Sequence, residues 1–186
     1  MQGKYKDKIL TLPNVLSLFR IILIPFIVYF YRIRENSFLA LITLIISGIT
    51  DITDGFIARR FGMVSDFGKV FDPIADKLTQ ASVLYCLVSR FGYMIVPLII
   101  LIVKELFTGI TGLVSIKKTN TVSGADWHGK LTTVGLYSMM AIHLVWYNIP
   151  RTLSFILVTA CIIIMVMSFL LYSIKNIRAI KEGSFK

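Results

Sequence analysis

The chain has 186 residues, of which 56% are hydrophobic, and a mean hydropathy of +0.78. These values exclude an ordinary soluble domain and indicate a helical membrane protein that crosses the bilayer several times. The net charge of +10 indicates contact with anionic lipid headgroups rather than with nucleic acid. The two cysteines, Cys86 and Cys161, lie in apolar segments without the spacing of a disulfide or a metal site.

Six apolar stretches follow one another along the chain, and each approaches the roughly 20 residues that an α-helix needs to cross a bilayer. We therefore predict an all-α polytopic membrane protein with six transmembrane helices in a single domain, residues 1–186. A polar and basic segment at residues 1–12 precedes them and is interpreted as an interfacial segment. The first span is expected to begin at Pro13 and to continue through the apolar run 21–31. The other expected spans are 37–60, 72–89, 93–115, 131–148 and 152–174.

Basic residues predict the orientation of these spans, because loops rich in Lys and Arg stay in the cytoplasm. Four basic residues fall on one side, namely Arg32, Arg34, Arg90 and Arg151. The other side has Lys4, Lys6, Lys8, Arg59, Arg60, Lys69, Lys117, Lys118, Lys130, Lys175, Arg178, Lys181 and Lys186. Both chain ends are therefore expected to face the cytoplasm, together with the segment that joins the second and third spans.

That joining segment, DITDGFIARRFGMVSDFGKVFDPIAD at residues 51–76, is unusually acidic for so apolar a chain. A carboxylate at membrane depth costs roughly 2.5–3.5 kcal/mol on insertion scales, so a group of them indicates a function. The helical period places Asp51 and Asp54 on one face with the small residues Gly55 and Ala58. The carboxylates in question are Asp51, Asp54, Asp72 and Asp76.

The second acidic pair, Asp72 and Asp76, has the spacing of one helix face. Asp72 is predicted to cap the N-terminus of the third span, with Pro73 at its first helical position. Residues 60–70 contain Gly62, Ser65 and Gly68 and are predicted to form a turn, which lets the two acidic faces converge.

Four carboxylates within a few ångströms of one another cannot all ionise unless cations lie between them. Ligand sets made only of oxygen favour Mg²⁺, Mn²⁺ or Ca²⁺. Gly55 and Ala58 leave room for a polyphosphate beside the metals, and Arg59 can pair with an anion. A set of ordinary helix caps and surface charges is the simpler alternative, which the apolar setting disfavours.

The spacing Asp-x2-Asp-Gly-x2-Ala-Arg-x8-Gly-x3-Asp-x3-Asp is matched without a gap. Its residues here are Asp51, Asp54, Gly55, Ala58, Arg59, Gly68, Asp72 and Asp76. The pattern is long and fixed in spacing, and it resembles that of the CDP-alcohol phosphatidyltransferases. Similarity to the bacterial phosphatidylglycerophosphate synthase branch of that family extends from LPNVLSLFRI, near the start, to His128-Gly129-Lys130.

The resemblance implies a six-helix enzyme of the bacterial cytoplasmic membrane, usually a homodimer. Such an enzyme moves a phosphatidyl group from CDP-diacylglycerol to an alcohol and releases CMP. It implies two divalent cations, Mg²⁺ or Mn²⁺, bound by Asp51, Asp54, Asp72 and Asp76, with Asp76 also acting as the base on the acceptor hydroxyl. It further implies that CDP-diacylglycerol contacts Asp54, Gly55, Ala58, Arg59 and Gly68.

The acceptor is expected to be sn-glycerol 3-phosphate, which would give phosphatidylglycerophosphate. Lys104 and Glu105 lie inside the fourth span, where a charged pair indicates a function, although a buried structural ion pair is the alternative. Lys130 matches a Gly-Lys pair of the family. Lys104 and Lys130 are predicted to hold the acceptor phosphate as point charges.

Two alternatives stay open. Relatives commonly have Arg-Glu-Phe where this chain has Lys104, Glu105 and Leu106, and Lys does not grip a phosphate bidentately as Arg does. Phosphatidylglycerol is therefore a second possible acceptor, which would make the enzyme a CMP-forming cardiolipin synthase. A divalent-cation transporter is an alternative of another class, although Gly55, Ala58 and Arg59 have no evident use in an ion pathway.

Three further residues receive structural interpretations. Arg20, near the start of the first span, is interpreted as an arginine that reaches toward lipid headgroups, with binding of a substrate phosphate as the less favoured role. His128 is interpreted as an exposed loop residue, and His143 as a packing residue of an apolar helix.

Overall fold

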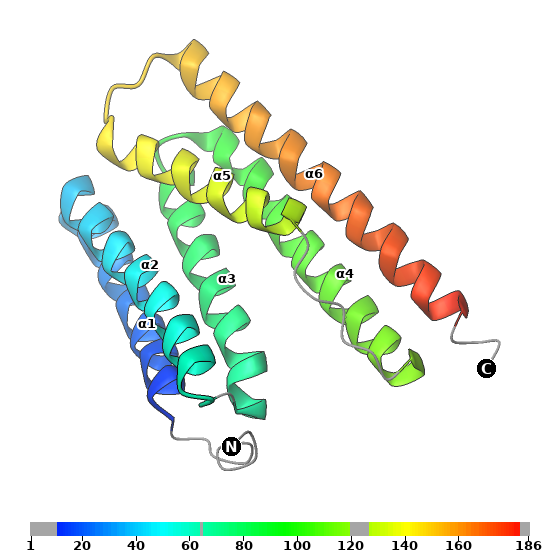
Figure 1. Cartoon of the computed structure of the whole chain (residues 1–186). Coiled ribbons are helices and arrows are strands. Elements are labelled where there is room, and N and C mark those ends of the chain that lie inside the picture. The colour runs from blue at the N-terminus through cyan, green and yellow to red at the C-terminus, as the bar shows by residue number, and fades with distance from the viewer. Residues whose placement is uncertain (1–10, 64, 120–126, 183–186) are drawn as a thin grey trace. The chain divides into compact units, whose positions relative to one another are not determined.

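The computed structural model describes residues 11–63, 65–119 and 127–182, which are helical apart from short connectors and contain no strand. The prediction of an all-α fold is confirmed (Figure 1). The described residues form six α-helices, with a π-helical turn (η1) that directly follows α1 and a 3-10 turn (η2) that directly precedes α4. In chain order the elements are α1 (Leu12–Val28), η1 (Tyr29–Ile33), α2 (Ser37–Arg60), α3 (Asp66–Val88), η2 (Gly92–Met94), α4 (Ile95–Thr119), α5 (Trp127–Val145) and α6 (Arg151–Glu182).

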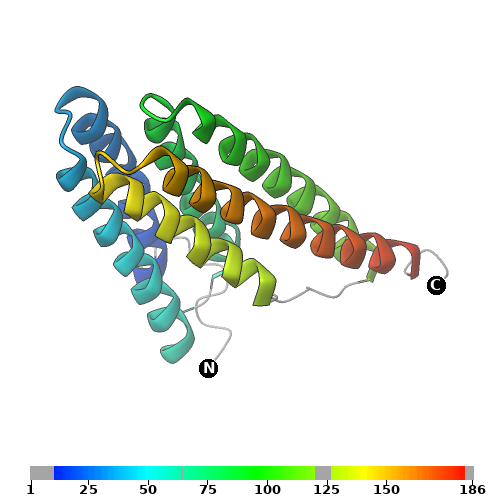
Figure 2. The ribbon, with the colours of Figure 1, turned by 90° about the horizontal axis from the view of Figure 1, so that it is seen from above.

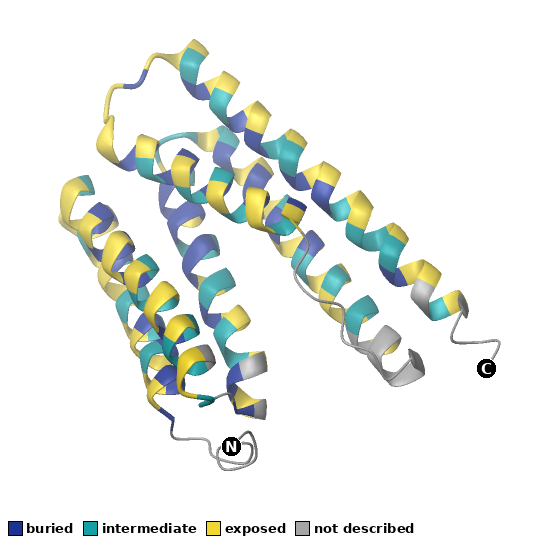
Figure 3. Cartoon of the chain, in the orientation of Figure 1, coloured by how far each residue is buried: buried dark blue, intermediate teal, exposed yellow. Residues whose placement is uncertain are grey.

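Four stretches of the described chain are long and apolar enough to cross a membrane, namely Leu12–Ile33, Ser37–Ala58, Gly92–Gly112 and Arg151–Arg178. The helices α3 and α5 are not among them, so a count of six spans stays a prediction. Much of the length of these helices is exposed (Figure 3). Many of the exposed side chains are apolar, including Ile22, Ile45, Ile99 and Ile156. Exposed apolar faces of this extent indicate contact with lipid.

The chain forms two compact units, Met1–Arg90 and Phe91–Lys186. In the first unit, α1 packs against both α2 and α3. In the second unit, α6 packs against both α4 and α5 and lies between them (Figure 2). Each unit is thus built around one central helix. The predicted single domain over residues 1–186 stays a prediction.

The turn between α2 and α3 is shorter than the sequence predicts. Gly62 has φ +62°, a left-handed conformation that suits glycine, and the Met63 N–H bonds the Ala58 carbonyl at 3.1 Å. This arrangement is a Schellman motif, which satisfies the last carbonyls of α2. Ser65 then caps α3, because its Oγ accepts a hydrogen bond from the Gly68 N–H at 2.9 Å.

The prediction that Asp72 caps the third helix is therefore wrong. Asp72 and Pro73 lie inside α3, which begins at Asp66. Ser65 starts the helix earlier because Asn14 of α1 holds it across the unit: Asn14 Nδ2 donates to Ser65 Oγ at 2.9 Å. Pro73 removes one backbone hydrogen bond from α3, and the helix continues through it.

In the second unit, a buried polar cluster joins η2, α5 and α6. The Ser154 hydroxyl lies 2.5 Å from Tyr93 Oη and 2.6 Å from His143 Nε2. His143 Nδ1 lies 2.7 Å from the Met139 carbonyl. The interpretation of His143 as a packing residue is confirmed, and its buried ring is also hydrogen-bonded on both nitrogens.

We predict that Gly68→Ala destabilises the protein. A Cβ at position 68 would overlap Asn14 Oδ1 and lie 3.1 Å from Ser65 Oγ, and Asn14 cannot withdraw without breaking its bonds to Ser65. Overpacking of this kind costs about 1–3 kcal/mol, and the apparent unfolding temperature in detergent measures it. Gly48→Ala is the matched control, because no atom lies within 4 Å of a Cβ there. Equal stability of the two variants would contradict the close α1–α3 approach.

Candidate functional site

The four aspartates of the motif lie on two helices of the first unit. Asp51 and Asp54 belong to α2, and Asp72 and Asp76 belong to α3. The Asp51 carboxylate is close enough to those of Asp72 and Asp76 for their charges to interact, and the Asp54 carboxylate is close enough to that of Asp72. The structure therefore brings the two acidic pairs into one region.

A buried arginine of α1 binds both aspartates of α2. Arg20 is 0% exposed, and its Nη1 lies 2.7 Å from Asp51 Oδ1. Its Nη2 donates a short hydrogen bond to Asp54 Oδ2. The interpretation that Arg20 reaches toward headgroups is wrong, because the two carboxylates supply a counter-charge inside the unit.

Ser17 connects the carboxylates of the two acidic helices. Its Oγ lies 3.1 Å from Asp54 Oδ2 and 2.5 Å from Asp72 Oδ1. The hydroxyl has one proton, so it donates to one carboxylate at a time. Sequence reasoning did not identify Ser17. The signal was present, however, because Asn14, Ser17 and Arg20 recur every third residue and form a polar stripe in an apolar helix.

Asp76 is held by neighbours on its own helix. Gln80 Nε2 donates to Asp76 Oδ2 at 2.9 Å, and Lys77 Nζ lies 3.2 Å from the same oxygen. Asp76 is thus fixed in orientation while its side chain keeps some exposure, at 14%.

The remaining motif residues are distributed along the same two helices. Gly55 and Ala58 are partly buried on α2, and Gly68 is buried on α3. Gly68 has a packing reason to be small, since Asn14 occupies the space that a Cβ would need. The side chain of Arg59 lies outside the described residues.

The two predicted acceptor lysines belong to the second unit and differ in burial. Lys104 of α4 is 6% exposed, with its Nζ 2.7 Å from Glu105 Oε1 and 5.9 Å from the centre of the Tyr172 ring. Lys130 of α5 is exposed. The charged pair predicted for the fourth span is thus present as an ion pair.

The interpretation of His128 as an exposed loop residue is wrong. The helix α5 begins at Trp127, earlier than the predicted 131, and His128 lies in its first turn. The His128 side chain is buried because α6 covers it: its Nδ1 lies 3.1 Å from Ser168 Oγ, and its ring centre lies 4.4 Å from that of Tyr172. Lys104 and His128 therefore share Tyr172 as a neighbour.

The acidic site suits a hard divalent cation by its donor atoms. Within the described residues, no three acidic, histidine or cysteine side chains are placed to hold a metal ion as they stand. Asp51 and Asp54 instead bind the guanidinium of Arg20, so this pair already holds one cationic group. Carboxylate oxygens are the ligands that Mg²⁺ and Mn²⁺ prefer. The assignment of all four aspartates to metals stays a prediction.

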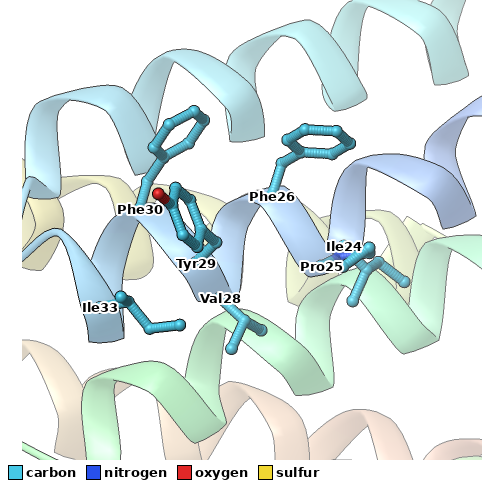
Figure 4. Close-up of a pocket in the computed structure, with 7 residues that line it drawn as sticks. All are labelled: Ile24, Pro25, Phe26, Val28, Tyr29, Phe30 and Ile33. Atoms are coloured by element: carbon cyan, nitrogen blue, oxygen red, sulfur yellow. The ribbon is translucent and has the colours of Figure 1, made fainter.

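Two open apolar grooves lie apart from these residues. One is lined by side chains of α1 and η1 between Ile24 and Ile33 (Figure 4). The other is lined by α6 between Arg151 and Ile163. Neither contains an acidic residue or a predicted site residue, so both are interpreted as lipid-facing surface.

Comparison with known proteins identifies relatives along most of the chain. The sequence model of the CDP-alcohol phosphatidyltransferase family matches residues 10–172. A protein of Aquifex aeolicus named CDP-diacylglycerol–glycerol-3-phosphate 3-phosphatidyltransferase is 30% identical over 92% of this chain and 98% of its own length. Proteins of the same name are 34% identical in Rickettsia typhi and 30% in Escherichia coli, over 59% and 66% of this chain. The match covers 63% of the Rickettsia protein and 70% of the Escherichia coli protein.

We predict that Mn²⁺ raises the apparent unfolding temperature of the purified protein. A ligand that binds only the folded state stabilises it by about 2.7 kcal/mol at one hundred times its Kd. Asp54→Asn should remove most of that increment, measured against the same variant in EDTA. Glu35→Gln, which changes an exposed carboxylate in the α1–α2 connector, should keep it. An undiminished increment in Asp54→Asn would exclude Asp54 as a ligand.

Proposed function

The chain belongs to the CDP-alcohol phosphatidyltransferase family, and on that premise we propose that it transfers the phosphatidyl group of CDP-diacylglycerol to sn-glycerol 3-phosphate. The products are phosphatidylglycerophosphate and CMP. The observation that carries the proposal is the acidic site of α2 and α3, with its complete motif, in a chain whose relatives bear that activity's name.

In the proposed reaction, the acceptor hydroxyl oxygen attacks the phosphorus that bears diacylglycerol. The bond from that phosphorus to the bridging oxygen breaks, and CMP leaves with that oxygen. Asp76 takes the hydroxyl proton as general base, and Gln80 and Lys77 keep its carboxylate oriented. Two divalent cations, Mg²⁺ or Mn²⁺, bound by the four aspartates would offset the charge of the pyrophosphate and of the departing CMP.

The donor is proposed to lie along the motif face of α2. Gly55 and Ala58 are small residues on the face that carries Asp51 and Asp54, so a bulky nucleotide can approach the carboxylates there. Arg59 would pair with the pyrophosphate. Gly68 contributes by letting α3 approach α1 closely, which the contact with Asn14 supports.

The acceptor phosphate is proposed to bind Lys104 and Lys130. Lys104 is the stronger candidate, because a buried ammonium acts through a lower dielectric than an exposed one. The Tyr172 ring lies 5.9 Å from Lys104 Nζ, and the His128 ring packs against Tyr172, so both residues bring polar groups to this region. Lys130 is exposed and would add a weaker, screened contribution.

The setting proposed for the reaction is the cytoplasmic face of a bacterial cytoplasmic membrane, with the protein as a homodimer. The four long apolar helices support the membrane location, and the distribution of Lys and Arg supports the orientation. The family match crosses both compact units, which supports one functional domain.

An acceptor screen tests the proposed function. Purified protein with Mg²⁺ and CDP-diacylglycerol labelled in its lipid part is offered glycerol 3-phosphate or phosphatidylglycerol, and CMP and labelled lipid are measured. We expect product with glycerol 3-phosphate. Asp76→Asn is the negative control and should lower turnover by roughly 10²–10⁴-fold, the usual contribution of a general base.

The remaining outcomes of the acceptor screen would each contradict one part of the proposed function. Cardiolipin formed from phosphatidylglycerol, with no product from glycerol 3-phosphate, would replace the proposed acceptor by a lipid. No CMP with either acceptor would contradict both glycerol 3-phosphate and phosphatidylglycerol as acceptors and would favour divalent-cation transport as the function of the acidic site. Normal turnover in Asp76→Asn would remove Asp76 as the base.

We further predict that Lys104→Ala raises the KM for glycerol 3-phosphate by about tenfold or more, the range expected for a lost charge-assisted contact. The KM for CDP-diacylglycerol should change much less. Lys104→Arg should retain most of the affinity, and Lys130→Ala should have a smaller effect because Lys130 is exposed. Lys181→Ala, an exposed lysine of α6, is the control. An equal rise in both KM values would contradict an acceptor-phosphate site at Lys104.

A further inference from the structure

Arg20 is a buried charge that the proposed reaction does not use. It lies on α1, outside the motif segment 51–76, yet its guanidinium contacts two of the four motif aspartates. Arg20 and Lys77 together offset half of the formal charge of the four carboxylates. The acidic site of the first unit is thus partly neutralised by side chains of the chain itself.

The guanidinium of Arg20 has hydrogen-bonding capacity left over. Its Nε has no hydrogen-bond partner among the described residues, and its Nη1, although close to Asp51 Oδ1, is outside hydrogen-bonding geometry. A guanidinium has five N–H donors, and each buried donor without a partner costs free energy. Asp51 and Asp54 therefore do not satisfy all the N–H donors of Arg20, which points to a further anionic ligand.

The same contacts create a competition. Arg20 holds Asp51 Oδ1 and Asp54 Oδ2, which are oxygens that a divalent cation would need. Two positive groups between the same carboxylates repel each other, so binding of the cation requires Arg20 to give up at least part of its hold. A buried charge that loses its partner strongly destabilises the folded protein, so Arg20 then needs another anion close by.

We propose that Arg20 exchanges partners during donor binding. It holds Asp51 and Asp54 in the metal-free protein, and it binds the pyrophosphate of the nucleotide-lipid donor once divalent cations hold the carboxylates. This inference rests on the proposed function for the identity of the donor. Arginine suits the second role because its planar N–H pairs match two phosphate oxygens. Ser17 is uncharged and can keep its contacts with Asp54 and Asp72 throughout.

The first test is Mn²⁺ binding without donor, measured by electron paramagnetic resonance of free Mn²⁺. Removing the competing charge in Arg20→Gln should tighten Mn²⁺ binding by about tenfold, the scale of one charge-assisted contact. Arg20→Lys keeps a charge and should shift the Kd less. Arg32→Gln, which changes an exposed arginine of η1, should match the wild type. Unchanged or weaker Mn²⁺ binding by Arg20→Gln would overturn the competition.

The second test is the binding of CDP, used as a probe that carries the donor's pyrophosphate, to protein saturated with Mn²⁺. Isothermal titration calorimetry should show affinity about tenfold lower in Arg20→Gln, with a smaller loss in Arg20→Lys and none in Arg32→Gln. An Arg that serves only to stabilise the unit would leave the affinity for CDP unchanged, and that result would overturn the partner exchange. If Arg20→Gln does not fold, smaller shifts in the same two directions are required of Arg20→Lys.

The two proposals fail in distinguishable ways. Normal CMP release by the wild type together with neither shift would overturn the role of Arg20 alone. If the Arg20 variants show both the Mn²⁺ and the CDP affinity shifts but the wild type releases no CMP, the proposed reaction is overturned. The partner exchange of Arg20 is then still supported. A wild-type protein that binds no CDP in the presence of Mn²⁺ and releases no CMP would overturn both.

Discussion

A charge inside an apolar helical unit is stable only beside an opposite charge, and Arg20 between Asp51 and Asp54 is where this constraint acts most strongly here. It explains why α1 is the central helix of the first unit. Arg20 connects α1 to α2, while Ser17 reaches the carboxylates of both α2 and α3. The polar stripe of α1 is therefore the element on which the positions of the acidic residues depend.

Much of this arrangement was predictable, because the helical period fixes which residues share a face. The spacing of Asp51 from Asp54, and of Asp72 from Asp76, predicted two acidic helix faces, and α2 and α3 carry them. The start of α3 was not predictable in this way, because Ser65 and Asp72 both qualify as caps by local sequence. The contact of Ser65 with Asn14, fifty-one residues away, favours the earlier cap.

The same limit applies to the polar residues whose partners lie on other helices. An arginine that precedes an apolar run normally extends toward headgroups, and only the position of Asp54 across the unit shows that Arg20 points inward. His128 follows a polar sequence typical of a loop, yet Ser168 and Tyr172 of α6 bury it. Local pattern predicts helices and faces, whereas long-range pairs decide the burial of single polar residues.

The pairing of Arg20 with α2 also affects how the first two helices are inserted into the membrane. Arg20 lies within the apolar stretch Leu12–Ile33, and an arginine at the centre of a lone spanning helix costs roughly 2.5–3.5 kcal/mol to insert. Its counter-ions arrive only with the next helix, after a connector of a few residues. The helix α1 is therefore stable in the bilayer only once α2 has been synthesised. We expect the two helices to insert together as a helical hairpin.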